Sequence, residues 1–298
     1  MHEPSKWTVG LVHAGLTAFT FAVLFPVLWV VKMALTPSQA FSLSANPFPA
    51  PSKVSLTNFR ELIFSRWAST AEAWPWWPDA LGFELPVFVW QFLNSTVIAG
   101  ATTLLGVGLA TTAAYAFSRF RFPGRASGMR LLLVTQMFPG VVMTIPLYII
   151  LQKLHLLDSM TGMALVYSTT AVPFCVWMLK GYFDTIPEEL EEAAIMDGMD
   201  RFSIFTKIVL PLAKPGIVVT ALFSFMTAWN EFILAATFLS KPTTFTLPVA
   251  LQRHVGDFST EWGLFAAGAI IASVPVMVLF FMLQEHLVSG LTAGSVKG

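Results

Sequence analysis

The chain has 298 residues, of which 55% are hydrophobic and only 11% are charged. Soluble globular domains carry about 25% charged residues, so this composition does not suit a surface that faces water on all sides. It suits a chain whose surface faces lipid. The 17 basic and 17 acidic residues cancel, which excludes the net positive field that would attract nucleic acid.

Six uncharged, apolar windows are long enough to cross a bilayer, which takes about 20 helical residues. They cover residues 7–31, 85–118, 131–152, 159–179, 215–230 and 262–284, and the fifth continues apolar to residue 239. The sequence therefore predicts an all-α, polytopic membrane protein with six transmembrane helices. The first window is too long for a signal peptide and no cleavage pattern follows it, so we expect a retained helix. Pro139, Pro146, Pro173 and Pro275 are expected to kink the third, fourth and sixth helices.

Lys and Arg residues in the short loops predict the orientation, because they accumulate in cytoplasmic loops. The loop after the second helix carries Arg119, Arg121, Arg125 and Arg130, whereas the loop after the third carries only Lys153. We therefore expect the arginine-rich loop and both termini in the cytoplasm. The chain then divides into an N-terminal helix (1–32), an extracytoplasmic loop (33–87), a five-helix transmembrane core (88–287) and a cytoplasmic tail (288–298). Within the extracytoplasmic loop, residues 57–64 predict a short amphipathic helix.

A polar stretch lies between the fourth and fifth helices, with seven acidic residues between positions 184 and 200. Thr185 and Glu188 predict a capping box at the start of a short helix, and Gly198 predicts its end. Asp200 predicts the cap of a second short helix that runs to residue 208, before Pro211 interrupts the chain. The result is two short cytoplasmic helices joined by a tight turn, which suits a groove in a partner. An ordinary surface hairpin fits the same residues.

The same stretch resembles the EAA signature of the membrane subunits of ABC importers, in which Glu-Ala-Ala is followed by a glycine and then by Ile-x-Leu-Pro. The resemblance implies that this segment is the coupling helix, which docks in a cleft of an ATPase subunit. The residues that it implies at this contact are Glu192, Ala193, Ala194, Met196, Asp197, Gly198, Ile208, Leu210 and Pro211.

The resemblance extends over residues 91–284, which look like the five-helix core of a type I importer. Residues 94–95, 113–124 and 136–139 are similar to its carbohydrate-uptake branch, and the C-terminus is similar to that of MalG-type subunits. This implies a MalG-type permease of a binding-protein-dependent carbohydrate importer in a bacterial or archaeal cell membrane. The implied partners are a second, MalF-type permease, an ATPase dimer that binds ATP-Mg, and an extracytoplasmic sugar-binding protein. It also implies that Gly290, Gly294 and Lys297 of the tail reach the ATPase.

The chain itself lacks a G-x-x-x-x-G-K-[ST] motif, so ATP must be bound by a separate subunit. Its five histidines lack metal-ligand spacing and no catalytic constellation is present, so we expect a transport subunit without catalytic residues, metal or cofactor. Polar or aromatic residues inside the spans are candidates for the translocation path. These are Gln136, Trp229, Asn230 and Glu231, with Glu231 two-thirds along the fifth helix.

Several alternatives fit the same residues. By resemblance, maltose or a maltodextrin is the expected substrate, but trehalose, glycerol-3-phosphate or another glycoside is compatible with the same motifs. An ion-coupled secondary transporter would require inverted repeats and several intramembrane charges, and neither is found. Glu231 is the clearest ionisable residue inside a span and has no titratable partner nearby in the sequence, which argues against an intramembrane enzyme. Its carboxylate lines a path for sugar, holds a gate by hydrogen bonds, or reaches interfacial water.

Overall fold

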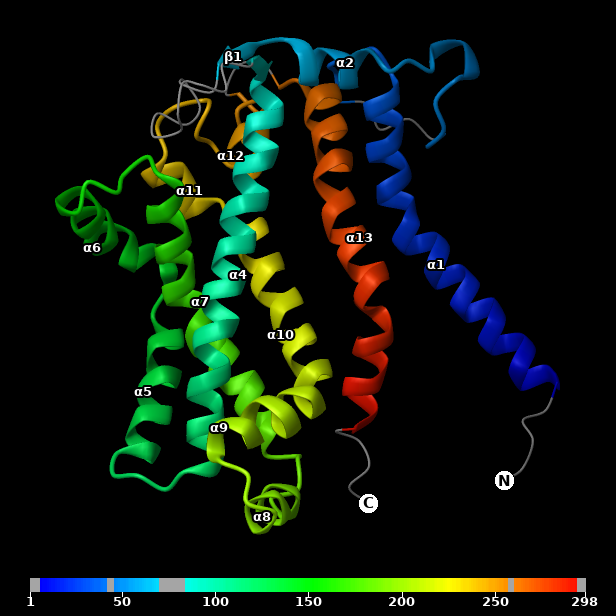
Figure 1. Ribbon diagram of the computed structural model, residues 1–298. Helices are drawn as coiled ribbons and strands as arrows, with labels where there is room; N and C mark the ends of the chain where they lie inside the picture. Colours follow the sequence, from blue (N-terminus) through cyan, green and yellow to red (C-terminus); the bar gives the residue numbers. More distant parts are fainter. Residues whose placement is uncertain (1–5, 42–45, 70–83, 257–259, 294–298) are drawn as a thin grey trace.

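The computed structural model describes residues 6–41, 46–69, 84–256 and 260–293. Long helices run between two opposite ends of a bundle, and short elements cover each end (Figure 1). The elements are α1 (Lys6–Leu35), η1 (Pro51–Lys53), α2 (Thr57–Phe64), β1 (Trp67–Ser69), β2 (Glu84–Pro86), α4 (Val87–Arg119), α5 (Arg125–Met137), α6 (Gly140–Lys153), α7 (Met160–Phe183), α8 (Glu189–Met196), α9 (Arg201–Ile204), η3 (Phe205–Val209), α10 (Leu210–Trp229), α11 (Ile233–Phe238), α12 (Leu247–Gln252) and α13 (Trp262–Ala293). The two strands pair antiparallel, with Ala68 opposite Leu85.

Five helical segments are long and apolar enough to cross a membrane: α1, α4, α7, α13 and the continuous stretch from α9 through α10. The pair α5 and α6 supplies a sixth crossing if the bent pair counts as one span. The prediction of an all-α, polytopic membrane protein is therefore confirmed. The short helix predicted at residues 57–64 is also present, as α2.

The third predicted span is broken rather than kinked. Its two halves, α5 and α6, meet at an angle of 100°. Phe138, the residue between α5 and Pro139, is extended with φ −74° and ψ 128°, because a residue before proline is pushed out of the helical region. Pro139 also lacks the backbone N–H that would continue the ladder. The expected single helix over 131–152 was therefore wrong, although Pro146 lies inside the continuous α6.

The fifth predicted span is wrong at both ends. It starts ten residues before Pro211, because α9, η3 and α10 form one continuous stretch, Arg201–Trp229. A five-residue π-helical segment, η3, precedes the proline, and its wider turn relieves the clash between a proline ring and the carbonyl four residues earlier. At the other end the helix stops at Trp229, and residues 233–238 form the separate helix α11.

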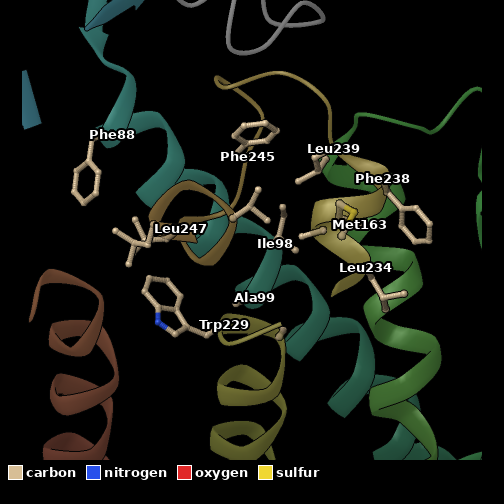
Figure 2. Close-up of a cluster of buried hydrophobic side chains, with 14 of the residues drawn as sticks. Phe88, Ile98, Ala99, Met163, Trp229, Leu234, Phe238, Leu239, Phe245 and Leu247 are labelled. Atoms are coloured by element: carbon tan, nitrogen blue, oxygen red, sulfur yellow. The ribbon is translucent and has the colours of Figure 1, made fainter. Parts of the chain in front are cut away.

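Helices α4, α7 and α10 form the centre of the bundle, and α13 packs against α10. Small residues allow this approach: a side chain at Gly106 of α4 would meet Ala171 of α7 and Ser224 of α10, each at 3.6 Å. Such residues are common where membrane helices pack closely. Figure 2 shows one of the buried clusters, in which Ile98 and Trp229 face Leu247. The bundle therefore fixes the short helices α11 and α12 against the long ones.

The N-terminal helix α1 contacts α13 and α2 but diverges from the rest of the bundle along its length (Figure 1). Asn58 of α2 holds its end, since its side-chain amide donates to the carbonyls of Met33, Ala34 and Thr36. At the other terminus α13 continues to Ala293. The expected tail boundary at residue 288 therefore lies inside a helix.

Candidate functional site

The tight turn expected between the two short cytoplasmic helices is present between α8 and α9. Gly198 has φ +84°, in the left-handed region that favours glycine. Its N–H donates to the carbonyl of Ile195, and the N–H of Met199 donates to Ala194, both at 3.0 Å. These bonds satisfy carbonyls at the end of α8 and fix the angle at which the chain leaves it.

The caps of the two helices follow the sequence only in part. The Asp200 carboxylate accepts hydrogen bonds from the N–H groups of Phe202 and Ser203 at 3.1 Å, so the predicted cap of α9 is confirmed. These bonds, with that from the Ser203 hydroxyl first, hold the pKa of Asp200 below its ordinary value. The capping box at Thr185 was wrong. The Thr185 hydroxyl instead donates to the carbonyl of Tyr182, in the last turn of α7, and α8 starts at Glu189.

Helix α8 has an outer and an inner face. Glu192, Ala193 and Met196 face outward, and Met196 is 87% exposed. Glu191 and Ala194, three residues apart and thus on one side of the helix, are only 4% and 5% exposed. The two alanines of the motif therefore differ: Ala193 is open to a partner, whereas Ala194 packs into the protein's own core.

The inner face holds an ion pair that the sequence did not reveal. Arg119, at the end of α4, donates from Nε to Oε1 of Glu191 at 2.5 Å, and both side chains are almost fully buried. Tyr115, one turn earlier, donates to Oε2 at 2.8 Å. A second Arg119 nitrogen donates to the carbonyl of Ile186 at 2.8 Å. Removing one partner of such a buried pair typically costs about 3–5 kcal/mol, because the other charge is left unpaired.

The remaining candidate residues of the motif lie at the base of the fifth span. Ile208 belongs to η3, and its half-buried side chain packs against the core cluster that contains Ala194. Leu210 is half-buried and Pro211 is exposed, both in the first turn of α10. Asp197 is exposed at the turn. The motif therefore covers both α8 with its turn and the segment that attaches them to the bundle, rather than one continuous surface.

The translocation candidates separate into three places. Trp229 and Asn230 line a cavity of about 590 Å³ between the end of α10, α12 and α13. Trp229 is buried and its indole N–H donates to the carbonyl of Ala272 at 3.2 Å, so its ring is fixed in place. Asn230 is exposed at the same cavity, together with Gln252 and Ser273.

Glu231 lies in the break after α10 rather than within a helix, which corrects its predicted position. Its carboxylate accepts hydrogen bonds from the N–H groups of Leu234 and Ala235, at 2.9 and 3.1 Å. The Tyr167 hydroxyl of α7 donates to it at 2.7 Å. The carboxylate thus caps α11 and fastens it to α7, which explains physically why the fifth span ends where it does.

Gln136 is separate from these residues, on α5, and its side chain donates to the carbonyl of Thr170 on α7 at 3.0 Å. In the tail, Gly290 lies within α13. Gly294 and Lys297 lie outside the described residues. The structure therefore brings together only Trp229 and Asn230 of the four path candidates.

Long apolar helices, with a polar two-helix segment exposed at one end of the bundle, define a multi-pass membrane protein. The sequence belongs to the family of binding-protein-dependent transport system inner membrane components, which it matches over residues 103–292. It is 34% identical to the maltose/maltodextrin permease MalG of Salmonella typhimurium, over 99% of this chain and 98% of that protein. It is 33% identical to the inner membrane ABC transporter permease YcjP of Escherichia coli, over 96% and 95% of the two chains.

The fold is similar to that in the crystal structure of a bacterial ABC transporter involved in the import of the acidic polysaccharide alginate. The TM-score is 0.73 at 20% identity, over 96% of this chain and 98% of that chain. The sequence therefore establishes the chain as the membrane subunit of an ABC importer, and its fold is similar to that of such a transporter. The resemblance carried by the EAA motif is confirmed at the level of the family.

Proposed function

We propose that this chain is a permease subunit of an ATP-driven sugar importer in the cell membrane, and that it forms half of the translocation path. Its partners in this proposal are a second, MalF-type permease, an ATPase dimer and an extracytoplasmic sugar-binding protein. The observation that carries the proposal is the exposed face of α8, Glu192, Ala193 and Met196, at the rigid Gly198 turn. This face is a short helix with an apolar knob, which suits a groove in an ATPase subunit.

Sugar is the substrate class supported by several relatives. The permeases MalG of Salmonella typhimurium and MdxG of Bacillus subtilis are described as maltose/maltodextrin and maltodextrin transport proteins. SmoH of Agrobacterium fabrum is described as a sulfoquinovosyl glycerol transport protein. The cavity beside Trp229 has an aromatic wall with amide and hydroxyl groups from Asn230, Gln252 and Ser273, which suits a polyhydroxylated ligand. We propose maltose or a maltodextrin first, with other glycosides as alternatives.

In the proposed cycle, closure of the ATPase dimer moves α8, and the permease helices change the side to which the cavity opens. The tail after residue 288 would add a second contact with the ATPase. A conformational change of this kind needs a partner that binds one state better than the other. ATP binding supplies that difference on the ATPase subunits, since this chain has no phosphate-binding loop.

The test is reconstitution of the cognate complex in proteoliposomes, with maltose, maltotriose, trehalose and glycerol-3-phosphate as substrates. We expect sugar-loaded binding protein to stimulate ATP hydrolysis and uptake of one of these solutes. Glu192→Lys should abolish the stimulation, because it places a cation on the exposed face of α8, while the complex still inserts and co-purifies. Normal stimulation in Glu192→Lys would contradict the coupling role. Absence of uptake of any tested solute by the wild-type complex would contradict the assignment of substrate class.

A further inference from the structure

Helix α4 has polar anchors at both of its ends, and the two anchors hold different segments of the chain. At one end Arg119 and Tyr115 hold Glu191 of α8. At the other end, Asn94 donates to the carbonyls of Thr243 and Phe245, at 2.8 and 3.1 Å. These two residues belong to the loop between α11 and α12. One helix therefore connects the proposed ATPase contact with that loop.

The anchor at the loop end is buried and made of several bonds. Ser95 accepts a hydrogen bond from the N–H of Leu247, the first residue of α12, at 2.7 Å. Gln91 donates to the carbonyl of Pro242 at 2.9 Å. Asn94 and Ser95 are buried, so these bonds do not compete with solvent and hold the loop firmly. Leu247, Pro248, Leu251 and Gln252 of α12 form one wall of the cavity that Trp229 lines.

The anchor at the α8 end also joins α7. The Ser118 hydroxyl donates to Asp184 at 2.6 Å, and Arg119 donates to Ser118 at 3.1 Å. The ring of Tyr115 is held by Phe205, with ring centroids 4.6 Å apart. Glu191 is the only buried Asp or Glu in the part of the chain that the structure describes. Burying a charged carboxylate costs desolvation free energy. The burial of Glu191 therefore points to a role in fixing the position of α8 against α4.

Between its anchors α4 is well suited to transmit movement. It is 33 residues long, about 50 Å of helix. Proline lies in the interior of every other described span: Pro26 in α1, Pro173 in α7, Pro215 in α10 and Pro275 in α13, as well as Pro146 in α6. The interior of α4 has none. Because proline is a main cause of helix kinks, α4 lacks a cause of bending that the other described spans carry.

We propose that α4 transmits displacement of α8 to the α11–α12 loop and thereby to the wall of the cavity. In this scheme Arg119 and Glu191 are positioning residues at one end, and Asn94 and Ser95 are positioning residues at the other. The inference rests on the proposed function, because it assigns a route between the ATPase contact and the cavity. It predicts that a substitution that weakens the anchor at either end of α4 uncouples ATP hydrolysis from the sugar-loaded binding protein.

The experiment uses the complete transporter in nanodiscs and compares ATPase rates with and without the sugar-loaded binding protein. Glu191→Gln keeps a side-chain oxygen as hydrogen-bond acceptor but removes the charge opposite Arg119. The complex that assembles should keep the basal rate but have a stimulation ratio lowered by at least about fivefold, the low end of typical coupling energies. Glu189→Gln, the same change at an exposed position of α8, is the matched control and should keep the ratio. A merely structural defect would instead reduce assembly and the basal rate together.

The decisive measurement is a double-mutant cycle across α4, between Glu191→Gln and Ser95→Ala. The two anchors are 24 helical residues apart, about 36 Å, and sites this distant normally have additive effects. If α4 carries the coupling, the double variant should be no worse than the more severe single variant. Effects that multiply, or a normal ratio in Glu191→Gln, would overturn the proposal.

A milder variant keeps the test valid if Glu191→Gln does not assemble. Tyr115→Phe removes one hydrogen bond to Glu191 but leaves the ring to pack against Phe183 and Phe205. It should also lower the stimulation ratio, and an unchanged ratio would contradict the proposal. Failure of the wild-type complex to respond to any binding protein would contradict the proposed function instead, so the two failures are distinguishable.

Discussion

Asp158 is the residue whose charge ties two loops together at the end of the bundle opposite α8. Its carboxylate accepts hydrogen bonds from the Ser240 N–H, the Ser240 hydroxyl and the Thr244 hydroxyl, and Lys241 lies 4.0 Å away. Burial raises the pKa of Asp158, but the bonds from Thr244 and Ser240 and the charge of Lys241 outweigh it, so the net pKa is lowered. The loops before α7 and after α11 are therefore joined most strongly when Asp158 is ionised.

The expected stability effect follows from the sign of this shift. A carboxylate with a lowered folded-state pKa contributes fully above its unfolded pKa of about 3.9, and the contribution is lost as the pH falls through the folded value. Asp158→Asn should therefore lower the Tm of the detergent-purified complex at pH 7 by about 2–4 °C. The difference from wild type should narrow below about pH 4. Asp197→Asn, at an exposed carboxylate, is the control, and an equal loss there would contradict a specific role for Asp158.

Glu231 and Asn230 are neighbours with different expected roles. Three hydrogen bonds hold the Glu231 carboxylate at the start of α11, whereas Asn230 faces the cavity. Glu231→Ala should lower the free energy of unfolding by about 1–3 kcal/mol, the cost of leaving buried partners unpaired, with an unchanged KM for sugar. Asn230→Ala should raise the KM with little effect on stability. Thermal unfolding and uptake kinetics on both variants check this pair, and the opposite pattern would restore Glu231 to the translocation path.

At the scale of elements, the turn between α8 and α9 depends on the backbone of Gly198. Gly198→Ala should destabilise the turn by about 1–2 kcal/mol, since a Cβ is disfavoured at φ +84°. Gly198→Pro should do more, because proline fixes φ near −65° and removes the N–H that bonds to Ile195. We expect it to abolish stimulated ATP hydrolysis while the chain still inserts. Stimulation that survives Gly198→Pro would show that the angle between α8 and α9 is unimportant.

Two of the three elements that depend on local chemistry were predicted correctly, and the capping box at Thr185 was the exception. The Gly198 turn and the Asp200 cap each require only a few consecutive residues, and both are present. The end of the fifth span was not predictable in this way. Residues 215–239 are apolar apart from a short interruption, and the break exists because the Tyr167 hydroxyl and two N–H groups of α11 hold Glu231. Apolar windows count crossings but do not locate such breaks.

The candidate site likewise has one part that was predictable from local sequence and one part that depends on distant contacts. The exposed face of α8 follows from the motif, but its inner face depends on Arg119 and Glu191, which are 72 residues apart in the sequence. The only signal in the sequence was an arginine-rich loop on the same expected side as an acidic helix. That signal shows that the two segments have complementary charges. It does not show which of the four arginines pairs with which of the seven acidic residues. Only the packing of α4 against α7 makes the choice.

At the scale of the whole molecule, the composition predicted a surface that faces lipid, and the structure shows which helices carry that surface. Large apolar side chains are exposed along α1, α5 and α6, including Phe19, Leu131 and Ile145. Lipid is the environment that accepts them, together with a second membrane subunit over part of this surface. The polar α8 and the β1–β2 sheet lie at opposite ends of the bundle (Figure 1). The two ends of the bundle are therefore distinguishable, and which end lies in the cytoplasm can be measured.

The proposed orientation places α8, the arginine-rich loop and both termini in the cytoplasm. The chain is suited to a test with membrane-impermeant maleimide because its one cysteine, Cys175, is buried. Lys53→Cys, at an exposed position of η1, should be labelled in intact spheroplasts. Arg121→Cys, at an exposed position of the loop after α4, should be labelled only after permeabilisation. The unsubstituted chain supplies the background.

The reverse labelling pattern would show the opposite orientation in the membrane. It would exclude the proposed ATPase contact, because α8 lies at the same end of the bundle as residue 121. Labelling of both positions from outside would contradict the count of crossings instead, since one candidate membrane-spanning helix, α4, separates them within the described chain. The two positions thus test orientation and span number independently. Agreement with the expected pattern would place the Glu191 anchor of α4 on the side where ATP is available.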